Sequence, residues 1–260
     1  MSSPLSYVKV VASEGYMRLF GNRGPFRFLS NQTAKLFPAA LGDELCSDLV
    51  SVIDETINDP NNGRIWQDEL NSDVRILQFE KDIPDHIDQF GIEDHIANID
   101  AFLGSTTRSW MLMANRLTPR PGNLGSGGGF HRDSPFSHQV KCIWYLSDVG
   151  PENGPFGYVD GTDKNLVGQN RQFPLGQYRF ETIDQPVTEV VAPAGTLLVC
   201  DTRCIHGGVP IREGHRYAVT LYTFRESNDV ESMFAKSGLD PAIVSQAGSS
   251  IEARSISRTL

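Results

Sequence analysis

The second half of the chain, from residue 108 to residue 225, is a succession of short β-prone segments separated by turn-forming residues. The β-prone segments are residues 110–117, 139–149, 186–193, 195–201 and 215–224. Loops rich in glycine, proline and asparagine lie between them, and the stretch ENGPFGYVDG is interpreted as turns. Short strands at this spacing are typical of an antiparallel sandwich or barrel.

The first half of the chain contains helix-forming patterns in addition to one short β-prone segment. Residues 42–59 place leucine, valine and isoleucine at intervals near 3.6 after an acidic first turn, which predicts a helix that the turn cluster Pro60-Asn61-Asn62-Gly63 ends. Residues 74–80 read as a short strand, and residues 92–103 as a second amphipathic helix. Helices first and antiparallel strands later indicate a double-sheet jelly roll with helices on one outer face.

The predicted fold class is therefore mainly β with flanking helices, a cupin-like double-stranded β-helix or jelly roll. A chain of 260 residues fits one such domain. We expect residues 1–107 to form a helix-rich N-terminal portion, residues 108–225 the jelly-roll core, and residues 226–260 a C-terminal tail.

Charge and composition exclude several classes of protein. The formal charge of −9 argues against a nucleic-acid partner, which needs a net basic footprint. No apolar run approaches the length of a membrane span, and the N-terminal residues do not resemble a secretory signal, so we expect a cytoplasmic protein. The four cysteines form no CxxC pair, which favours reduced and buried thiols over a zinc site.

A potential metal-binding pattern lies in the strand-rich half. His131 and Asp133 are two residues apart, so in an extended segment both side chains point to the same side. His206 follows the apolar segment 196–201, and Arg216 comes ten residues after His206 on the next predicted strand. Two neutral imidazoles and one carboxylate suit iron(II) and leave three coordination positions open.

Those three positions match the needs of a 2-oxo acid oxygenase. Two suit a bidentate 2-oxo acid and the third suits O2. A second carboxylate at the far end of the acid requires a fixed cation, and arginine is better than lysine because its planar fork binds a carboxylate with two hydrogen bonds. Arg216 lies where such a cation is needed.

Two other kinds of protein remain as alternatives. A cupin-like metal-binding protein or isomerase acting on a carbohydrate or metabolite would keep the histidine cluster but would not need Arg216. A zinc hydrolase is less favoured, because no separate general base appears at motif spacing.

The strand-rich half resembles the phytanoyl-CoA dioxygenase-like branch of the iron(II)- and 2-oxoglutarate-dependent oxygenases over residues 110–224. The segments that carry the resemblance are HRD (131–133), KCIWYLSDVGPENGPFGYVDGTDK (141–164), GTLLVCDTRCIHGG (195–208) and HRYAVTLYTF (215–224). Where the family typically has Gly-Ser-His-Lys, this chain has Gly-Thr-Asp-Lys at 161–164. The first hundred residues carry no resemblance, and we expect them to help shape the substrate end.

The resemblance implies a function and a set of site residues. His131, Asp133 and His206 would bind iron(II), and Arg216 would pair with the C5 carboxylate of 2-oxoglutarate. Further cofactor contacts are expected from polar residues on neighbouring strands, with Lys141 and Asn115 ranked ahead of Thr220 and Tyr145. The implied reaction consumes O2, decarboxylates 2-oxoglutarate to succinate and hydroxylates a small organic substrate.

Several residues near these motifs have a structural interpretation that we weigh against a functional one. We expect surface positions for His86, His95 and His138, and by strand alternation His215 should face away from the site. Core packing is expected for Trp110 and Trp144, and Trp66 is left open between core and pocket. The run 122-GNLGSGGG-129 is interpreted as a flexible lid beside the iron or as a plain connector. Arg120, Arg132 and Arg203 are expected in surface ion pairs, with binding of an anionic substrate as the alternative.

Overall fold

The structure is a computed structural model that describes residues 4–133, 139–176 and 178–246. The four α-helices among the described residues are α1 (Pro4–Phe20), α2 (Asp43–Ile57), α3 (Ile92–Leu103) and α4 (Asp229–Lys236). The strands are β1 (Ala34–Phe37), β2 (Ile65–Gln67), β3 (Asp73–Leu77), β4 (Ser109–Leu117), β5 (Val140–Tyr145), β6 (Phe156–Val159), β7 (Thr188–Val190), β8 (Leu197–Asp201), β9 (Ile205–Gly208) and β10 (Arg216–Phe224). Short 3₁₀ helices cover Pro25–Ser30, Phe79–Lys81, Ile87–Phe90 and Pro241–Gln246.

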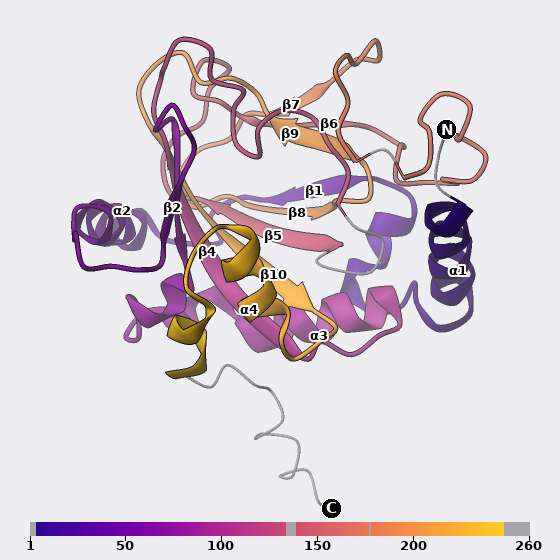
Figure 1. The fold of residues 1–260 in the computed structure, drawn as a ribbon, viewed down its shortest axis with the longest axis horizontal. Coiled ribbons are helices and arrows are strands. Elements are labelled where there is room, and N and C mark those ends of the chain that lie inside the picture. The colour runs from indigo at the N-terminus through magenta and orange to yellow at the C-terminus, as the bar shows by residue number, and fades with distance from the viewer. Residues whose placement is uncertain (1–3, 134–138, 177, 247–260) are drawn as a thin grey trace, which may run out of the picture.

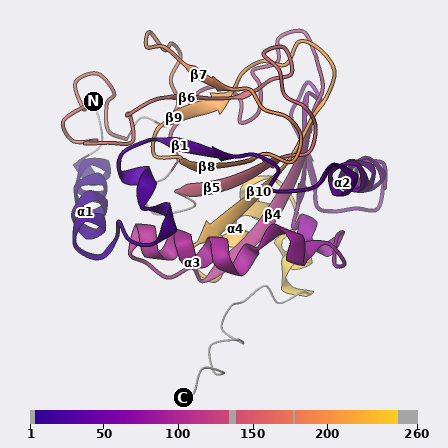
Figure 2. The same cartoon turned by 180° about the vertical axis from the view of Figure 1, so that it is seen from behind.

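The strands form two antiparallel sheets. The larger sheet has seven strands in the order β1-β8-β5-β10-β4-β3-β2, and the smaller has three in the order β7-β6-β9. The smaller sheet lies over one face of the larger, as the upper layer in Figures 1 and 2. This arrangement confirms the predicted jelly roll, and between residues 108 and 225 every described regular element is a strand.

The two faces of the larger sheet bury different sets of side chains, because successive residues of a strand point to opposite faces. Trp144, Val199 and Val219 belong to the main core, which they share with residues of α2 and α3. Ile143 and Ala218, one position away, face the smaller sheet in a second core. The helices therefore cover one outer face, as the sequence predicts, and the opposite face is left to line the space between the sheets.

The two amphipathic helices form where the sequence places them. In α2, Leu49 and Ile53 are fully buried, and Asp43 and Glu44 lie in the first turn, where carboxylates are favoured by the helix dipole. Helix α3 spans the predicted residues 92–103 and ends at Gly104, whose φ of +69° is the left-handed conformation that favours glycine.

Some regular elements were not predicted. Residues 156–159, within the stretch interpreted as turns, form β6, the central strand of the smaller sheet. This segment is short and contains glycine; a Cβ on Gly157 would lie 2.9 Å from a Val187 methyl carbon, so close packing requires the residue that weakens the strand signal. Helix α1 and strand β1 were also missed, and no helix among the described residues is long and apolar enough to cross a membrane.

The segment after residue 225, expected as a tail, contains α4 and a 3₁₀ turn in its described part. Val230, Phe234 and Val244 are buried against Met111 and Phe224 of the larger sheet. Residues 226–246 are thus packed onto the jelly-roll core.

Candidate metal centre

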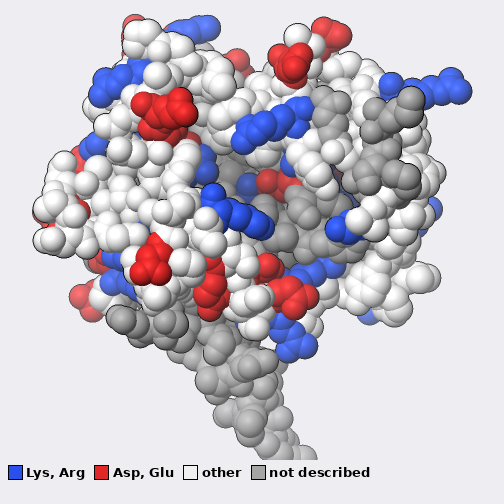
Figure 3. Space-filling model, viewed as in Figure 1, with Lys and Arg blue, Asp and Glu red and all other residues white. Residues whose placement is uncertain are grey.

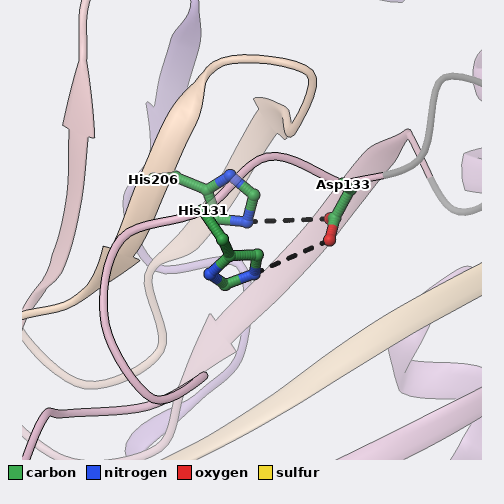
Figure 4. Close-up of side chains that lie close together, drawn as sticks. All are labelled: His131, Asp133 and His206. Carbon is green, nitrogen blue, oxygen red and sulfur yellow. Dashed lines mark ion pairs between the residues drawn. The ribbon is translucent and has the colours of Figure 1, made fainter. Parts of the chain in front are cut away.

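His131, Asp133 and His206 converge at the edge between the two sheets (Figure 4). One ligand atom from each lies within 4.8 Å of the others. The Nε2 atoms of His131 and His206 are 3.7 and 3.6 Å from the Asp133 carboxylate oxygens. No other group of this kind was found among the described residues.

Backbone pairing explains why residues so far apart in sequence meet. His131 and His206 exchange two backbone hydrogen bonds, of 2.8 and 2.9 Å, as directly opposite residues of an antiparallel pair do. Their side chains therefore project on the same side, with ring centroids 4.5 Å apart. Asp133 lies two residues after His131 and is held by a hydrogen bond from its amide to the Thr202 carbonyl.

Both imidazole rings are oriented by the protein. The Nδ1 atom of His131 lies 2.9 Å from the Gly129 carbonyl oxygen, and that of His206 lies 3.1 Å from the Cys204 carbonyl oxygen. A carbonyl can only accept, so each Nδ1 carries a proton and each Nε2 keeps its lone pair for a metal. In the described part of the chain, the buried Nε2 of His206 has no hydrogen-bond partner.

Burial also keeps the rings neutral. It lowers the pKa of His206 to about 3, although the neighbouring Asp133 carboxylate opposes that shift. The pKa of His131 is lowered for the same reason. Neutral imidazoles with a free Nε2 beside a carboxylate are the donor set that iron(II) requires.

The three residues open into a cavity of about 250 Å³ between the sheets. All the side chains that the sequence marks as cofactor contacts line it: Asn115, Lys141, Tyr145, Arg216 and Thr220. Lys141 and Tyr145 of β5 are four residues apart, as are Arg216 and Thr220 of β10, so each pair lies on one face of its strand. Strand pairing, which the sequence alone does not give, brings these residues and Asn115 of β4 to the same cavity. On the face shown in Figure 3 the surface is hollowed, and Lys and Arg side chains gather round the hollow.

Arg216 is buried in the wall of this cavity. One Nη donates a hydrogen bond of 2.6 Å to the Gly154 carbonyl, and the guanidinium lies 5.9 Å from the Tyr145 ring centroid. Its Nε has no partner among the described residues. The side chain is therefore fixed in place with hydrogen-bonding capacity to spare for an anion.

Lys141 and Asn115 make contacts within the protein. The Lys141 ammonium lies 2.6 Å from an Asp133 carboxylate oxygen. Burial alone would lower the pKa of Lys141, but this carboxylate outweighs burial and raises it. Asn115 donates a long hydrogen bond of 3.4 Å to Asp73. Contact of either residue with 2-oxoglutarate stays a prediction.

The cavity also has residues that sequence reasoning missed. Arg75 of β3 and Arg179 line it, and Arg75 forms an ion pair of 2.5 Å with Asp73. Arg75 lies opposite Asn115 in the β3–β4 pair, so its orientation follows only once that pairing is known. Arg179 donates to the Gly127 and Gly128 carbonyls and so holds the glycine-rich run beside His131.

The other histidines and tryptophans that had both a structural and a functional interpretation lie in different environments. His215 is exposed and points away from the cavity, and Trp110 and Trp144 pack in the main core, as expected. Trp66 lies beside an open groove, with Arg75 over its ring. His86 is half-buried, and His138 lies outside the described residues.

Three expectations of surface positions were wrong. The His95 ring packs on Phe26 and Trp144, because α3 turns that face toward the core. Arg203 is buried in an ion pair with Asp201, and Arg132 is buried with its guanidinium on the Thr162 carbonyl. Arg120 is exposed, and the four cysteines are free and buried, as expected.

A jelly roll with two histidines and one aspartate at a cavity that also contains a buried arginine defines a class: the metal- and 2-oxo-acid-dependent enzymes. Comparison with known proteins agrees. The family described as phytanoyl-CoA dioxygenase matches residues 30–216, most of the chain. The protein belongs to the phytanoyl-CoA dioxygenase family.

Solved structures show the same fold at low sequence identity. HygX from Streptomyces hygroscopicus, solved with nickel and 2-oxoglutarate, superposes with a TM-score of 0.53 at 18% identity, covering 78% of this chain and 87% of HygX. The carbocyclase SnoK of nogalamycin biosynthesis gives 0.51 at 17%, covering 76% and 82%. The epimerase SnoN gives 0.53 at 16%, covering 83% and 84%. No curated protein matches the chain by sequence.

Proposed function

We propose that this protein is an iron(II)- and 2-oxoglutarate-dependent hydroxylase of a small organic molecule. The observation that carries the proposal is the shared cavity: His131, Asp133, His206 and Arg216 all line the same space between the sheets. A metal bound by the two histidines and the aspartate leaves room in the cavity for a 2-oxo acid. The distal carboxylate of that acid would reach Arg216.

The residues present fit the cofactors. His206 offers a buried Nε2 without a hydrogen-bond partner among the described residues, which is costly unless a metal or solvent satisfies it. Bound iron would supply the activation of O2, coupled to the decarboxylation of 2-oxoglutarate to succinate. The chain's own residues hold the metal ligands in one tautomer, fix the distal carboxylate and exclude water from the space between the sheets.

Hydroxylation is proposed ahead of isomerisation by a cupin-like metal-binding protein. Arg216 supports this choice, since an isomerase needs no buried cation opposite the metal. Asp133 argues against a halogenase, because a carboxylate at this position occupies the place that a halide would need. The related structures include a carbocyclase and an epimerase that depend on the same co-substrate, so these outcomes are the nearest competitors.

The proposed substrate is a natural-product or glycan intermediate. HygX has been solved with hygromycin B bound, and SnoK and SnoN come from nogalamycin biosynthesis. In this chain an open groove continues from the cavity, sharing Arg75, Gly127 and Arg179 with it, and passes Trp66. An elongated molecule can lie in this groove with one end at the metal.

The test is consumption of 2-oxoglutarate by the purified protein with iron(II), ascorbate and O2. We expect slow succinate release without substrate, and abolition of it in His131→Ala, Asp133→Ala and His206→Ala variants that remain folded. Asp133→Gly discriminates further, because it should retain some iron through two histidines while losing turnover. Protein that is folded and iron-loaded but binds no 2-oxoglutarate would rule out the proposal.

A further inference from the structure

A second pocket, remote in sequence from the metal ligands, contains two arginines. It has a volume of about 420 Å³ and lies where helix α1 meets the loop after α3 and the adjoining ends of β4 and β10. Helix α1 lies beside α3 in both Figure 1 and Figure 2, and the two helices are in contact. The lining residues are Ala12, Ser13, Tyr16, Gly104, Ser105, Thr106, Arg108 and Arg225.

The two arginines lie where the β4–β10 pair ends. Phe224 lies opposite Ser109 at the end of the β4–β10 register, and Arg225 and Arg108 are the next residues of the two chain segments. The Arg108 amide donates a hydrogen bond of 2.7 Å to the Phe224 carbonyl, one residue out of that register, so the regular ladder ends here and Arg108 lies beside Phe224. Both arginine side chains line the same pocket, and like charges held close together repel.

No carboxylate lines the pocket to offset that repulsion. Among the described residues, neither arginine forms an ion pair within 4.0 Å, and Arg225 donates only a hydrogen bond of 3.3 Å to Gln139. The Asp100 carboxylate has a small favourable effect on the charge of Arg225, and its oxygens already accept hydrogen bonds from the amide and hydroxyl of Thr107. Two positive charges in one concave site, in a chain whose formal net charge is −9, favour the binding of an anion there.

The remaining lining residues fit a phosphate group. Ser13, Tyr16, Ser105 and Thr106 bring hydroxyl groups to the pocket. Guanidinium groups bind phosphate through paired, charge-assisted hydrogen bonds, and hydroxyls complete the coordination of its remaining oxygens. A single carboxylate has fewer acceptor oxygens and less charge to set between two arginines.

We propose that the pocket between α1 and the β4–β10 end is a binding site for a phosphate group, either free phosphate or a phosphate monoester. The site is separate from the metal centre: the residues lining the two cavities do not overlap. It does not depend on the proposed hydroxylase function.

Calorimetric titration with inorganic phosphate tests the site. The full chain is first saturated with 2-oxoglutarate so that Arg216 is occupied. We expect one phosphate per chain, with affinity reduced at least tenfold in Arg108→Gln and in Arg225→Gln, because each loses a charge-assisted pair. Arg120→Gln is the matched control: it removes the same charge from an exposed arginine that lines neither cavity.

A second titrant, phenyl phosphate, separates the two sources of the group. Tighter binding than phosphate assigns the site to a monoester whose organic part contacts Tyr16, and equal or weaker binding assigns it to free phosphate. The proposal is overturned if 10 mM phosphate, roughly the upper limit of a physiological anion site, gives no saturable binding. It is also overturned if Arg120→Gln weakens binding as much as Arg108→Gln does.

Discussion

Arg216 is the residue on which the choice between an oxygenase and a simple metal-binding protein depends. Its guanidinium is already fixed by the Gly154 carbonyl, so the remaining donors have a defined direction. Arg216→Lys keeps the positive charge but loses the planar guanidinium group, which can bind a carboxylate with two hydrogen bonds. We expect 2-oxoglutarate affinity to fall by about 2–4 kcal/mol, roughly thirty- to a thousand-fold, while iron affinity barely changes.

Pyruvate is the control ligand for this substitution, because it has no distal carboxylate for the arginine to bind. It should bind the wild type poorly and be almost indifferent to Arg216→Lys. Equal weakening of both acids, or of neither, would make Arg216 a structural residue, and the assignment of the co-substrate site would have to be withdrawn.

Gly127 controls the space around His131 in the glycine-rich loop. A Cβ at this position would lie 2.8 Å from the His131 Cε1, and φ is +87°. Gly127→Ala should therefore displace the ring and weaken iron binding by roughly ten- to a hundred-fold, as loss of ligand orientation typically does. Iron titration of the folded variant measures this.

Gly122→Ala is the matched control for Gly127→Ala. Gly122 has a similar φ of +82°, but nothing lies within 4 Å of its added Cβ. Both substitutions place a side chain at a similar positive φ, but only the Cβ of Gly127→Ala would meet His131. Equal iron affinities in the two variants would show that the loop does not position His131.

At the scale of single elements, the 3₁₀ turn Phe79–Lys81 places a carboxyl group in the interior. Burial raises the pKa of Glu80 to about 7, although it accepts a hydrogen bond of 2.9 Å from the Leu112 amide of β4. Between its ordinary pKa and about pH 7, Glu80 is ionised in the unfolded chain but still protonated in the native protein. Its contribution to stability is therefore complete at low pH and is lost as the pH rises through that window.

Glu80→Gln removes this titration while keeping an acceptor for the Leu112 amide. From pH 4.5 to pH 8 the free energy of unfolding of the wild type should fall by up to about 3 kcal/mol relative to the variant. Urea unfolding of both proteins at several pH values measures the difference, because the other carboxyl groups contribute equally to each. Parallel pH profiles would contradict the prediction.

Strand elements differ in how well their sequences predict them. β4, β5, β8 and β10 carry long β-branched and apolar segments, and all were predicted, because local periodicity determines which residues face the core. β6 and β9 are four residues each and contain glycines that permit close packing against other segments. Their strand conformation depends on partners distant in sequence, which the local pattern does not contain.

At the scale of the whole molecule, the same distinction separates the predicted from the missed site residues. His131, Asp133, His206 and Arg216 could be predicted as a candidate site because the HxD pattern, the later histidine and the arginine ten residues beyond it all fall in the strand-rich half. Arg75 and Arg179 come from segments whose position relative to the motif is determined by sheet pairing and loop packing. Arg132 and Arg203 were expected at the surface and are buried, because local sequence does not reveal which charged residues lie beneath a neighbouring loop.

The position of the three candidate metal ligands has a consequence for the motions of the protein. His206 belongs to β9 of the smaller sheet and His131 is paired with it, whereas the Asp133 amide donates a hydrogen bond to Thr202, directly after β8 of the larger sheet. An ion held by all three is a cross-link between the layers. Separation of the sheets must then break a coordination bond, so metal loading should suppress the opening of the layers that exposes backbone amides to solvent.

Hydrogen exchange in iron(II)-loaded and metal-free protein can observe this opening directly. Amides of β6 and β9 should exchange roughly tenfold more slowly at a metal concentration ten times the dissociation constant, while those of β2, at the far edge of the larger sheet, keep their rates. In Asp133→Gly the two histidines remain on one layer, so iron that still binds there should give no such protection. Asp133 would then have two roles: it would bind the metal, and it would determine how often the two sheets separate.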